Sequence, residues 1–187
     1  GFDVVEASIP EMQRAMEEGR VTSRALVEAH LLRIALYEER VNAVIAINAD
    51  ALAEADRLDQ ERAEGRVRGP LHGIPVALKD NVHTTHIPTT GGTLAFEGFV
   101  PPYEATLTAN LREAGAIILA KTVMTELANF MGSGMPGNYS AVGGFGMNPY
   151  DPRPDPREGR NDGRPVMGTG GSSSGIGTAM SFWAANV

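Results

Sequence analysis

The feature that most constrains the fold of this chain is an amphipathic segment placed between two short apolar ones. Residues 74–78 and 116–120 are almost entirely apolar, which is typical of buried strands. Between them, residues 104–114 place Leu107 and Leu111 four positions apart, as on one face of a helix. Two strands joined through a helix predict a right-handed crossover and parallel pairing. We therefore expect an α/β fold built on a mainly parallel sheet.

The amino-terminal part of the chain, residues 1–65, is predicted to be a mostly helical lead-in to this sheet. Ser8 and Glu11 have the spacing of a capping box, in which their side chains satisfy free backbone N–H groups at a helix start. Residues 66–187 then form the beginning of the α/β core. The other elements expected before residue 66 are a helix starting at Thr22 or Ser23, a strand at 43–47 and an exposed helix at 49–64.

Composition excludes several classes of function. The net charge is −7 and no block of Lys and Arg occurs, which argues against a nucleic acid partner. The absence of cysteine rules out disulfides and thiolate metal ligands. His83 and His86 lie in a Thr- and Pro-rich stretch without a metal-binding motif, so no metal site is predicted. Because the longest apolar run is too short to cross a bilayer, we expect no membrane association and a cytoplasmic location.

After the second apolar strand, a short helix is predicted at 123–130, and a long stretch from residue 132 to residue 171 is predicted to be mostly loop. Within this stretch, residues 151–165 are charged and proline-rich, which favours an exposed insertion. Loops of this length are usually functional or disordered. A helix of small residues is predicted at 176–185. Two clear strands after residue 66 are too few to hold the helices assigned to them, so we expect a partial domain.

Residues 170–175 form the run Gly-Gly-Ser-Ser-Ser-Gly, for which several interpretations are open. Gly168 and Gly170 begin a GxGxxG pattern, but the third glycine of a nucleotide-binding loop is missing. Ser173 is the centre of a GxSxG pattern, the nucleophile elbow of α/β hydrolases. That elbow requires a preceding strand, which is not evident, and no His follows. A flexible connector is a third interpretation.

Lys79 adds a fourth interpretation, in which a serine of this run works with a base from the 74–78 strand. The chain has only two lysines, Lys79 and Lys121, and Lys79 ends that apolar strand. Burial lowers the pKa of a lysine, and a neutral lysine can take a proton from a serine hydroxyl. The alternatives are a lysine that forms a salt bridge with Asp80 and a surface lysine that extends its amine into solvent. Lys121→Ala is expected to lower turnover much less than Lys79→Ala.

Four segments, in this order, resemble the motifs of the amidase signature family. They are Gly-Ile-Pro-Val-Ala-Leu-Lys-Asp-Asn at 73–81, Gly-Ala-Ile-Ile-Leu-Ala-Lys-Thr at 115–122, Asn-Pro-Tyr at 148–150 and the serine run at 170–175. Their approximate spacing is similar too, and the helical amino-terminal part matches as well. The resemblance covers nearly the whole chain.

This resemblance implies both a fold and a chemistry. The implied fold is a mixed, mainly parallel sheet covered by helices, of which this chain would hold one part. Members of the family cleave amide bonds through an acyl-serine intermediate, using a serine, a second serine that follows a cis peptide bond, and a lysine. By position, Lys79 matches the base and Ser172 matches the serine that relays protons. The resemblance further implies a small-molecule amide substrate and neither cofactor nor metal, and it allows a homodimer.

Other parts of the implied site are less complete. No serine of this chain matches the attacking serine by position, so the nucleophile and the oxyanion hole are expected after residue 187. Ser173 is expected to support Lys79. Ala128 and Asn129 occupy the segment expected to border the substrate pocket. The nearby Phe130 and Met131 suggest an apolar acyl group, with a place in the core as the alternative.

Three functional hypotheses follow. The first is a free-standing amidase acting on carboxylic acid amides. The second is the amidase subunit of an amidotransferase, which works with partner chains. The third is a non-catalytic fragment, since the nucleophile is not in this chain. Residues 137–140 depart from the transferase type, and this favours the hydrolase.

Overall fold

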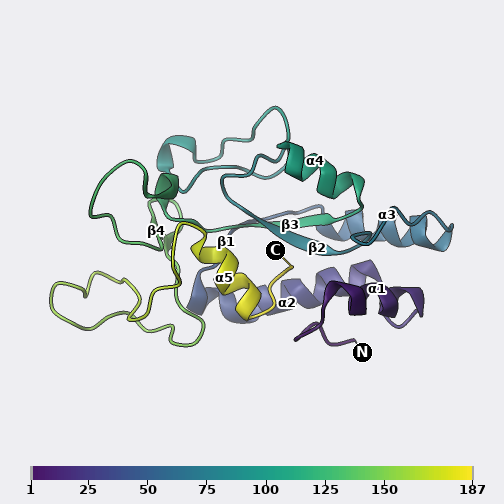
Figure 1. The fold of residues 1–187 in the computed structure, drawn as a ribbon, viewed down its shortest axis with the longest axis horizontal. Coiled ribbons are helices and arrows are strands. Elements are labelled where there is room, and N and C mark those ends of the chain that lie inside the picture. Colours follow the sequence, from purple (N-terminus) through teal and green to yellow (C-terminus); the bar gives the residue numbers. More distant parts are fainter. Residues whose placement is uncertain (1, 187) are drawn as a thin grey trace.

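The computed structural model describes residues 2–186 and shows a central sheet with helices packed around it (Figure 1). The strands are β1 (Val44–Ile47), β2 (Pro75–Lys79) and β3 (Ile117–Thr122), and their order in the sheet is β1–β3–β2. β2 and β3 run parallel, whereas β1 is antiparallel to β3. The sheet is therefore mixed, and the predicted parallel pair is confirmed.

The helix that connects the two parallel strands is α4 (Thr106–Glu113), and it packs against β3. The expected apolar face is wrong in detail, because Leu107 is 54% exposed. Thr108 is buried instead, and its hydroxyl donates to the carbonyl of His83 at 2.8 Å. A polar contact thus ties α4 to the loop that follows β2.

The amino-terminal helices begin at their predicted caps. α1 (Ile9–Glu17) starts with the capping box, in which the Ser8 N–H donates to Glu11 Oε2 at 2.8 Å. α2 (Ser23–Val41) is capped by Thr22, whose Oγ1 accepts from the Ala25 N–H at 3.1 Å. α3 (Ala51–Ala63) follows β1 and packs against α2 and β3. The strand β1, which lies in the lead-in segment, thus belongs to the same sheet as β2 and β3.

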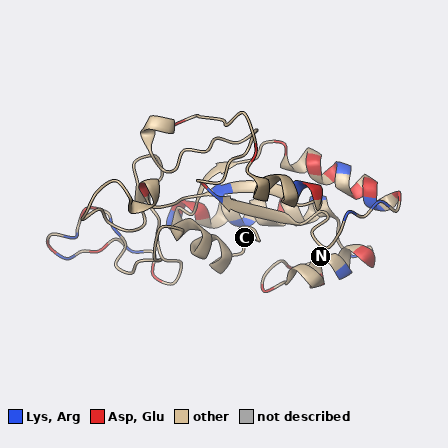
Figure 2. Cartoon of the chain, turned by 45° about the horizontal axis from the view of Figure 1, so that its top comes forward, with Lys and Arg blue, Asp and Glu red and all other residues tan. Residues whose placement is uncertain are grey.

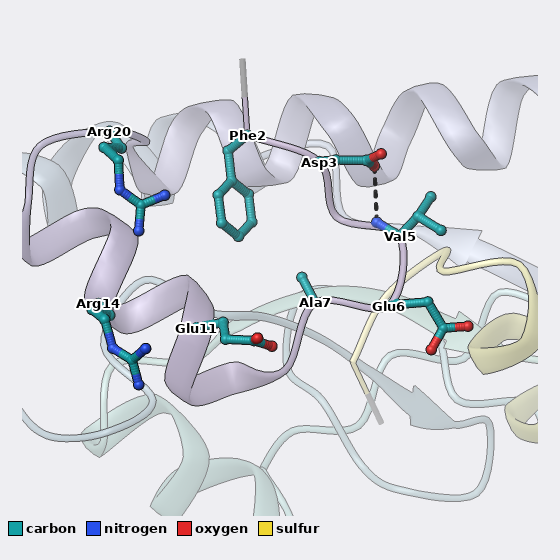
Figure 3. A pocket seen from close by; sticks show the side chains of 8 residues that line it. All are labelled: Phe2, Asp3, Val5, Glu6, Ala7, Glu11, Arg14 and Arg20. Carbon is teal, nitrogen blue, oxygen red and sulfur yellow. Dashed lines mark hydrogen bonds between the residues drawn. The ribbon is translucent and has the colours of Figure 1, made fainter.

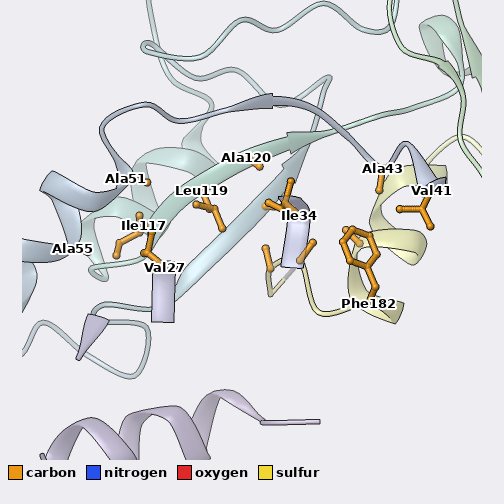
Figure 4. Packing of buried hydrophobic residues seen from close by; sticks show 14 of the residues in the cluster. Val27, Ile34, Val41, Ala43, Ala51, Ala55, Ile117, Leu119, Ala120 and Phe182 are labelled. Carbon is orange, nitrogen blue, oxygen red and sulfur yellow. The ribbon is translucent and has the colours of Figure 1, made fainter. Parts of the chain in front are cut away.

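Two clusters of buried side chains lie on the sheet. Along β2, Ala77 belongs to one cluster and its neighbours Val76 and Leu78 to the other, because successive side chains of a strand point to opposite faces. The first cluster joins Ile117 and Leu119 of β3 to α2, α3 and α5 (Ser174–Ser181), as Figure 4 shows. The second cluster includes residues of α1. Both faces of the sheet are thus covered.

The segment after β3 departs from its prediction. A helix is expected from the sequence at 123–130, but only the short 3₁₀ turn η2 (Glu126–Asn129) forms. Leu127 and Ala128 have φ values of 42° and 57°, in the left-handed region, so an α-helix cannot pass through them. The Leu127 N–H donates to the Gly91 carbonyl at 2.8 Å, so a tertiary contact replaces the helical one.

The stretch from residue 132 to residue 171 is mostly loop, as predicted, with little regular structure. It contains the small hairpin of β4 (Tyr139–Ser140) and β5 (Gly144–Phe145). Residues 151–165 form a loop that projects from the sheet and closes on itself through a bridge between Pro154 and Pro165 (Figure 1). Three of its four arginines form ion pairs with nearby carboxylates of the same loop: Arg153 with Asp151, Arg157 with Asp155, and Arg164 with Asp162.

Residues of both charge signs lie along α3 and along the 151–165 loop (Figure 2). Another 3₁₀ turn, η1 (Leu94–Phe96), lies in the connection between β2 and α4.

After α5 the chain returns to the free edge of β2, where the Ala77 N–H donates to the Asn186 carbonyl at 2.7 Å. Among residues 2–186, no helix combines the length and apolarity needed to cross a membrane.

Candidate active site

The structure brings Lys79 and Ser172 together from distant parts of the sequence. Lys79 is the last residue of β2, and Ser172 lies in the loop that leads into α5. The Lys79 Nζ donates a hydrogen bond to Ser172 Oγ at 2.6 Å. This distance falls within the reach needed for proton transfer between the two groups.

The environment of Lys79 makes its amine easier to deprotonate than in water. Burial lowers the pKa of Lys79 below its ordinary value, and no ion pair counteracts this among residues 2–186. The alternative partner, Asp80, is engaged elsewhere. Its carboxylate accepts from the backbone N–H groups of Thr90 and Gly92 and from the Thr90 hydroxyl. A lysine that is partly desolvated and free of a carboxylate is suited to act as a base.

Asp80 is instead paired with Lys121. Both side chains are fully buried, and Lys121 Nζ lies 3.5 Å from Asp80 Oδ1. Lys121 also donates to Thr89 Oγ1 at 2.8 Å, and burial lowers its pKa to about 8. This structural role of Lys121 was not predicted, although Lys121 lies at the end of a buried apolar strand, as Lys79 does. Truncation of Lys121 would leave the buried Asp80 carboxylate without its cation, so Lys121→Ala is expected to lower the stability of the protein, and its small effect on turnover stays a prediction.

Close backbone approach explains two glycines of the serine run. A Cβ on Gly175 would lie 2.5 Å from the Ala43 carbonyl oxygen and 2.6 Å from Val123 N, so only glycine fits there. A Cβ on Gly171 would lie 2.8 Å from Thr125 Oγ1. The loop is thus pressed against the residues that follow β3. The peptide bond between Gly171 and Ser172 is cis.

Ser173 is placed differently from its expected role. It is exposed and precedes α5 as the N-cap residue, and within residues 2–186 no hydrogen bond joins its side chain to Lys79. The nucleophile-elbow interpretation also lacks its required element, since residues 166–173 contain no strand. Among the three serines of the run, the described contacts therefore single out Ser172.

Ala128 and Asn129 lie in the turn η2, close in sequence to a residue that contacts the serine loop. Thr125 donates its N–H to the Ser172 carbonyl at 3.0 Å. A pocket of about 220 Å³ is lined partly by Leu127 of the same turn and by Asn81, which follows Lys79 by two positions. Its remaining lining residues are His83, Thr89, Gly91, Phe96 and Phe99.

Phe130 and Met131 do not belong to the core, which corrects one of the two alternatives for them. Phe130 is 91% exposed and Met131 is 73% exposed. The two histidines of the 83–86 loop have other neighbours: the His83 ring packs against Tyr103 at a tilt of 57°, and His86 contacts the Arg112 guanidinium. No apolar acyl pocket is built from Phe130 and Met131 in the described residues.

A larger hollow of about 450 Å³ lies at the amino-terminal end of the chain, between the first residues and α1 (Figure 3). Its acidic groups include two that already have partners within this segment. Glu11 accepts from Ser8, and Asp3 accepts from the Val5 N–H at 3.0 Å. Neither Lys79 nor Ser172 lines this hollow.

The family of the chain follows from comparison with known sequences. A family profile described as Amidase matches residues 25–185 of this chain. The chain belongs to the amidase family. The expected family and the expected fold class, a mixed sheet covered by helices, are both confirmed.

Individual relatives agree with this assignment. The chain is 41% identical over 150 residues to a glutamyl-tRNA(Gln) amidotransferase subunit from Streptomyces coelicolor, covering 80% of this chain and 29% of the relative. The X-ray structure of native peptide amidase from Stenotrophomonas maltophilia shares 40% identity, with a TM-score of 0.85 over 96% of this chain and 35% of that one. An amidase family protein from Bacillus anthracis is 36% identical, with a TM-score of 0.85 over 97% of this chain and 34% of that chain. The chain thus spans about a third of these proteins.

Proposed function

We propose that this chain supplies the base and the proton relay of an amidase that hydrolyses carboxylic acid amides through an acyl-serine intermediate. The observation that carries the proposal is the 2.6 Å hydrogen bond between Lys79 Nζ and Ser172 Oγ. Burial without a carboxylate partner lowers the pKa of Lys79, which favours the unprotonated amine that a base requires. Lys79 is the proposed base and Ser172 the proposed relay.

The proposed reaction proceeds in two stages. Lys79 accepts the proton of Ser172, while Ser172 accepts the proton of the attacking serine, whose oxygen bonds to the amide carbonyl carbon. The relay then runs backwards and protonates the leaving nitrogen as the C–N bond breaks. Water, deprotonated through the same relay, cleaves the acyl ester, which releases the acid and restores the serine.

The attacking serine belongs, in this proposal, to the longer protein. The relatives are about three times as long as the matched part, which is 29% of one and 35% of another. We place the nucleophile and the oxyanion hole after residue 187. Residues 1–187 then form the amino-terminal part of one amidase domain, with residues 1–65 as the lead-in and 66–187 as the start of its core.

We also propose that Ala128 and Asn129 border the bound substrate. They follow Thr125, whose N–H binds the Ser172 carbonyl. The neighbouring Leu127 lines the 220 Å³ pocket together with Phe96 and Phe99. The proposed substrate class, a small-molecule amide, rests on the membership of the chain in the amidase family.

The function is tested by incubating the full-length protein with simple carboxylic acid amides and C-terminally amidated peptides. Release of ammonia and acid in equal amounts, without any partner protein, is the expected result. The absence of hydrolysis for all amides, with the protein folded, would contradict the proposal.

A second candidate is the amidase subunit of an amidotransferase. It is favoured by the 41% identity to the glutamyl-tRNA(Gln) amidotransferase protein of Streptomyces coelicolor, which extends over 80% of the chain. The peptide amidase match covers 96% of the chain at 40% identity, and we therefore favour the free-standing hydrolase. Amide hydrolysis that requires co-purified partner subunits would support the transferase instead.

A further inference from the structure

Thr125 and Asn138 form a buried contact directly behind the serine loop. Thr125 is 1% exposed and Asn138 is 4% exposed. The backbone N–H of Asn138 donates to Thr125 Oγ1 at 3.1 Å. Thr125 in turn donates its own N–H to the carbonyl of Ser172 at 3.0 Å. The two residues are thus linked to each other and, through Thr125, to the backbone of Ser172.

Asn138 holds the other end of the same loop. With its side-chain amide oriented to satisfy its neighbours, it donates to the Gly170 carbonyl at 3.0 Å and accepts from the Thr169 N–H at 2.8 Å. Its backbone carbonyl accepts from the Gly146 N–H at 2.8 Å, which attaches it to the hairpin segment. Residues 169–172 are therefore held at both ends by this pair of residues.

We propose that Thr125 and Asn138 are positioning residues that keep Ser172 Oγ in contact with Lys79; this rests on the proposed proton relay. The loop itself is rich in glycine, at positions 168, 170 and 171, and glycine backbones have unusual conformational freedom. Such a loop does not hold a hydroxyl in one place unaided. Thr125 follows the end of β3, so its contacts anchor the backbone of Ser172 to the sheet.

The packing at Gly171 adds to the same restraint. Thr125 Oγ1 lies 2.8 Å from where a Cβ of Gly171 would stand, so the hydroxyl fills the space beside the loop. Valine at position 125 would keep the side-chain shape but replace this hydroxyl by a larger methyl group. It would also leave the Asn138 N–H without its acceptor. Serine at position 125 would keep the hydroxyl.

The test compares Thr125→Val and Thr125→Ser in the full-length protein, using an amide that the wild-type protein hydrolyses. We expect Thr125→Val to lower kcat by about tenfold to a hundredfold with KM nearly unchanged, because misplacing a reacting group by about 1 Å costs on the order of a hundredfold. Thr125→Ser should retain most of kcat. The matched control is Thr108→Val. It removes a buried hydroxyl elsewhere in the chain, on α4, and should leave kcat unchanged.

Crystal structures of the same variants separate this proposal from the proposed function. In Thr125→Val we expect Ser172 Oγ to move beyond hydrogen-bond distance of Lys79 Nζ. If Thr125→Val does not fold, Asn138→Gly serves instead, since Asn138 has φ 67° and glycine tolerates that backbone. A preserved Lys79–Ser172 bond in the folded variant overturns the positioning role, whatever the protein hydrolyses. Failure of the wild-type protein to hydrolyse amides overturns the function and leaves this structural test standing.

Discussion

At the scale of single residues, the two lysines of the chain have different roles because their surroundings differ. They lie on adjacent strands, where Lys79 is paired with Thr122 and Lys121 with Leu78. Lys79 is partly desolvated and contacts a serine hydroxyl, whereas Lys121 is fully buried beside a carboxylate. Burial lowers the pKa of both lysines, so their contacts separate the two roles: Lys79 binds the Ser172 hydroxyl, whereas Lys121 is paired with the Asp80 carboxylate.

The first prediction concerns Lys79. Lys79→Ala and Lys79→Arg in the full-length protein should both lower kcat by at least about a hundredfold, since a general base is lost and guanidinium stays protonated. For the wild-type protein, kcat/KM should rise with pH through the lowered pKa of Lys79, because only the neutral amine is active. Steady-state rates of ammonia release across pH provide the measurement. Near-normal turnover of Lys79→Arg would show that Lys79 is structural.

The second prediction concerns Lys121. Lys121→Ala should destabilise the protein by about 3–5 kcal/mol, because it leaves the buried Asp80 carboxylate without its cation. Adding Asp80→Asn should recover part of that loss, since the amide is uncharged. Chemical denaturation of the single and double variants measures both effects. A Lys121→Ala protein as stable as the wild type would refute the pairing.

At the scale of elements, a helix or strand could be predicted from the sequence where neighbouring residues alone determine it. The capping box at Ser8 and the strand–helix–strand pattern are local, and both were predicted correctly. The predicted helix at 123–130 does not form, because the Leu127 N–H binds the carbonyl of Gly91, which is distant in the sequence. A contact between Lys79 and a serine of the 170–175 run was one of several interpretations of the residues, and the family resemblance singled out Ser172. The Thr125–Asn138 contact carries no sequence signal, since it joins two loop positions whose pairing depends on the folded chain.

The third prediction concerns the junction between α2 and β1. Glu38 Oε1 accepts from the Val44 N–H at 2.7 Å, and burial raises the pKa of Glu38 to about 7 from 4.5. The folded state therefore binds this proton more tightly than the unfolded state, so the contribution is fully present below pH 4.5 and is lost as pH rises to 7. Glu38→Gln should remove this loss.

The measurement is the free energy of unfolding of both proteins between about pH 4.5 and about pH 7.5, a range that spans the two pKa values of Glu38. Relative to the wild type, Glu38→Gln should gain roughly 2 kcal/mol across this range, after allowance for partial solvent screening. Glu39→Gln, a neighbour on the same helix that is less buried, is the matched control and should show no such trend. Parallel pH curves for wild type and Glu38→Gln would contradict the buried-carboxyl argument.

At the scale of the whole molecule, the sheet and its helices form one packed body from which the 151–165 loop projects (Figure 1). The ion pairs of this loop are internal. Its two sides meet where the Asp155 N–H donates to the Arg164 carbonyl at 2.7 Å and the Val166 N–H donates to the Arg153 carbonyl at 2.9 Å. A segment that satisfies its own polar groups contributes little to the stability of the rest, and such segments tolerate replacement.

The fourth prediction follows from this arrangement. Replacing residues 155–164 by two glycines in the full-length protein should change the melting temperature by at most about 2–4 °C, the shift that about 1 kcal/mol produces in a protein of roughly 150–250 residues and more than it produces in a longer one. Calorimetry measures the melting temperature, and amide hydrolysis measures the site. A matched variant, Asp155→Ala, tests the most buried carboxylate of the loop, which is 2% exposed. A large loss of stability would show that the loop supports the core. An unchanged melting temperature with a lowered kcat/KM would instead show that the loop contacts the substrate, which its internal ion pairs argue against.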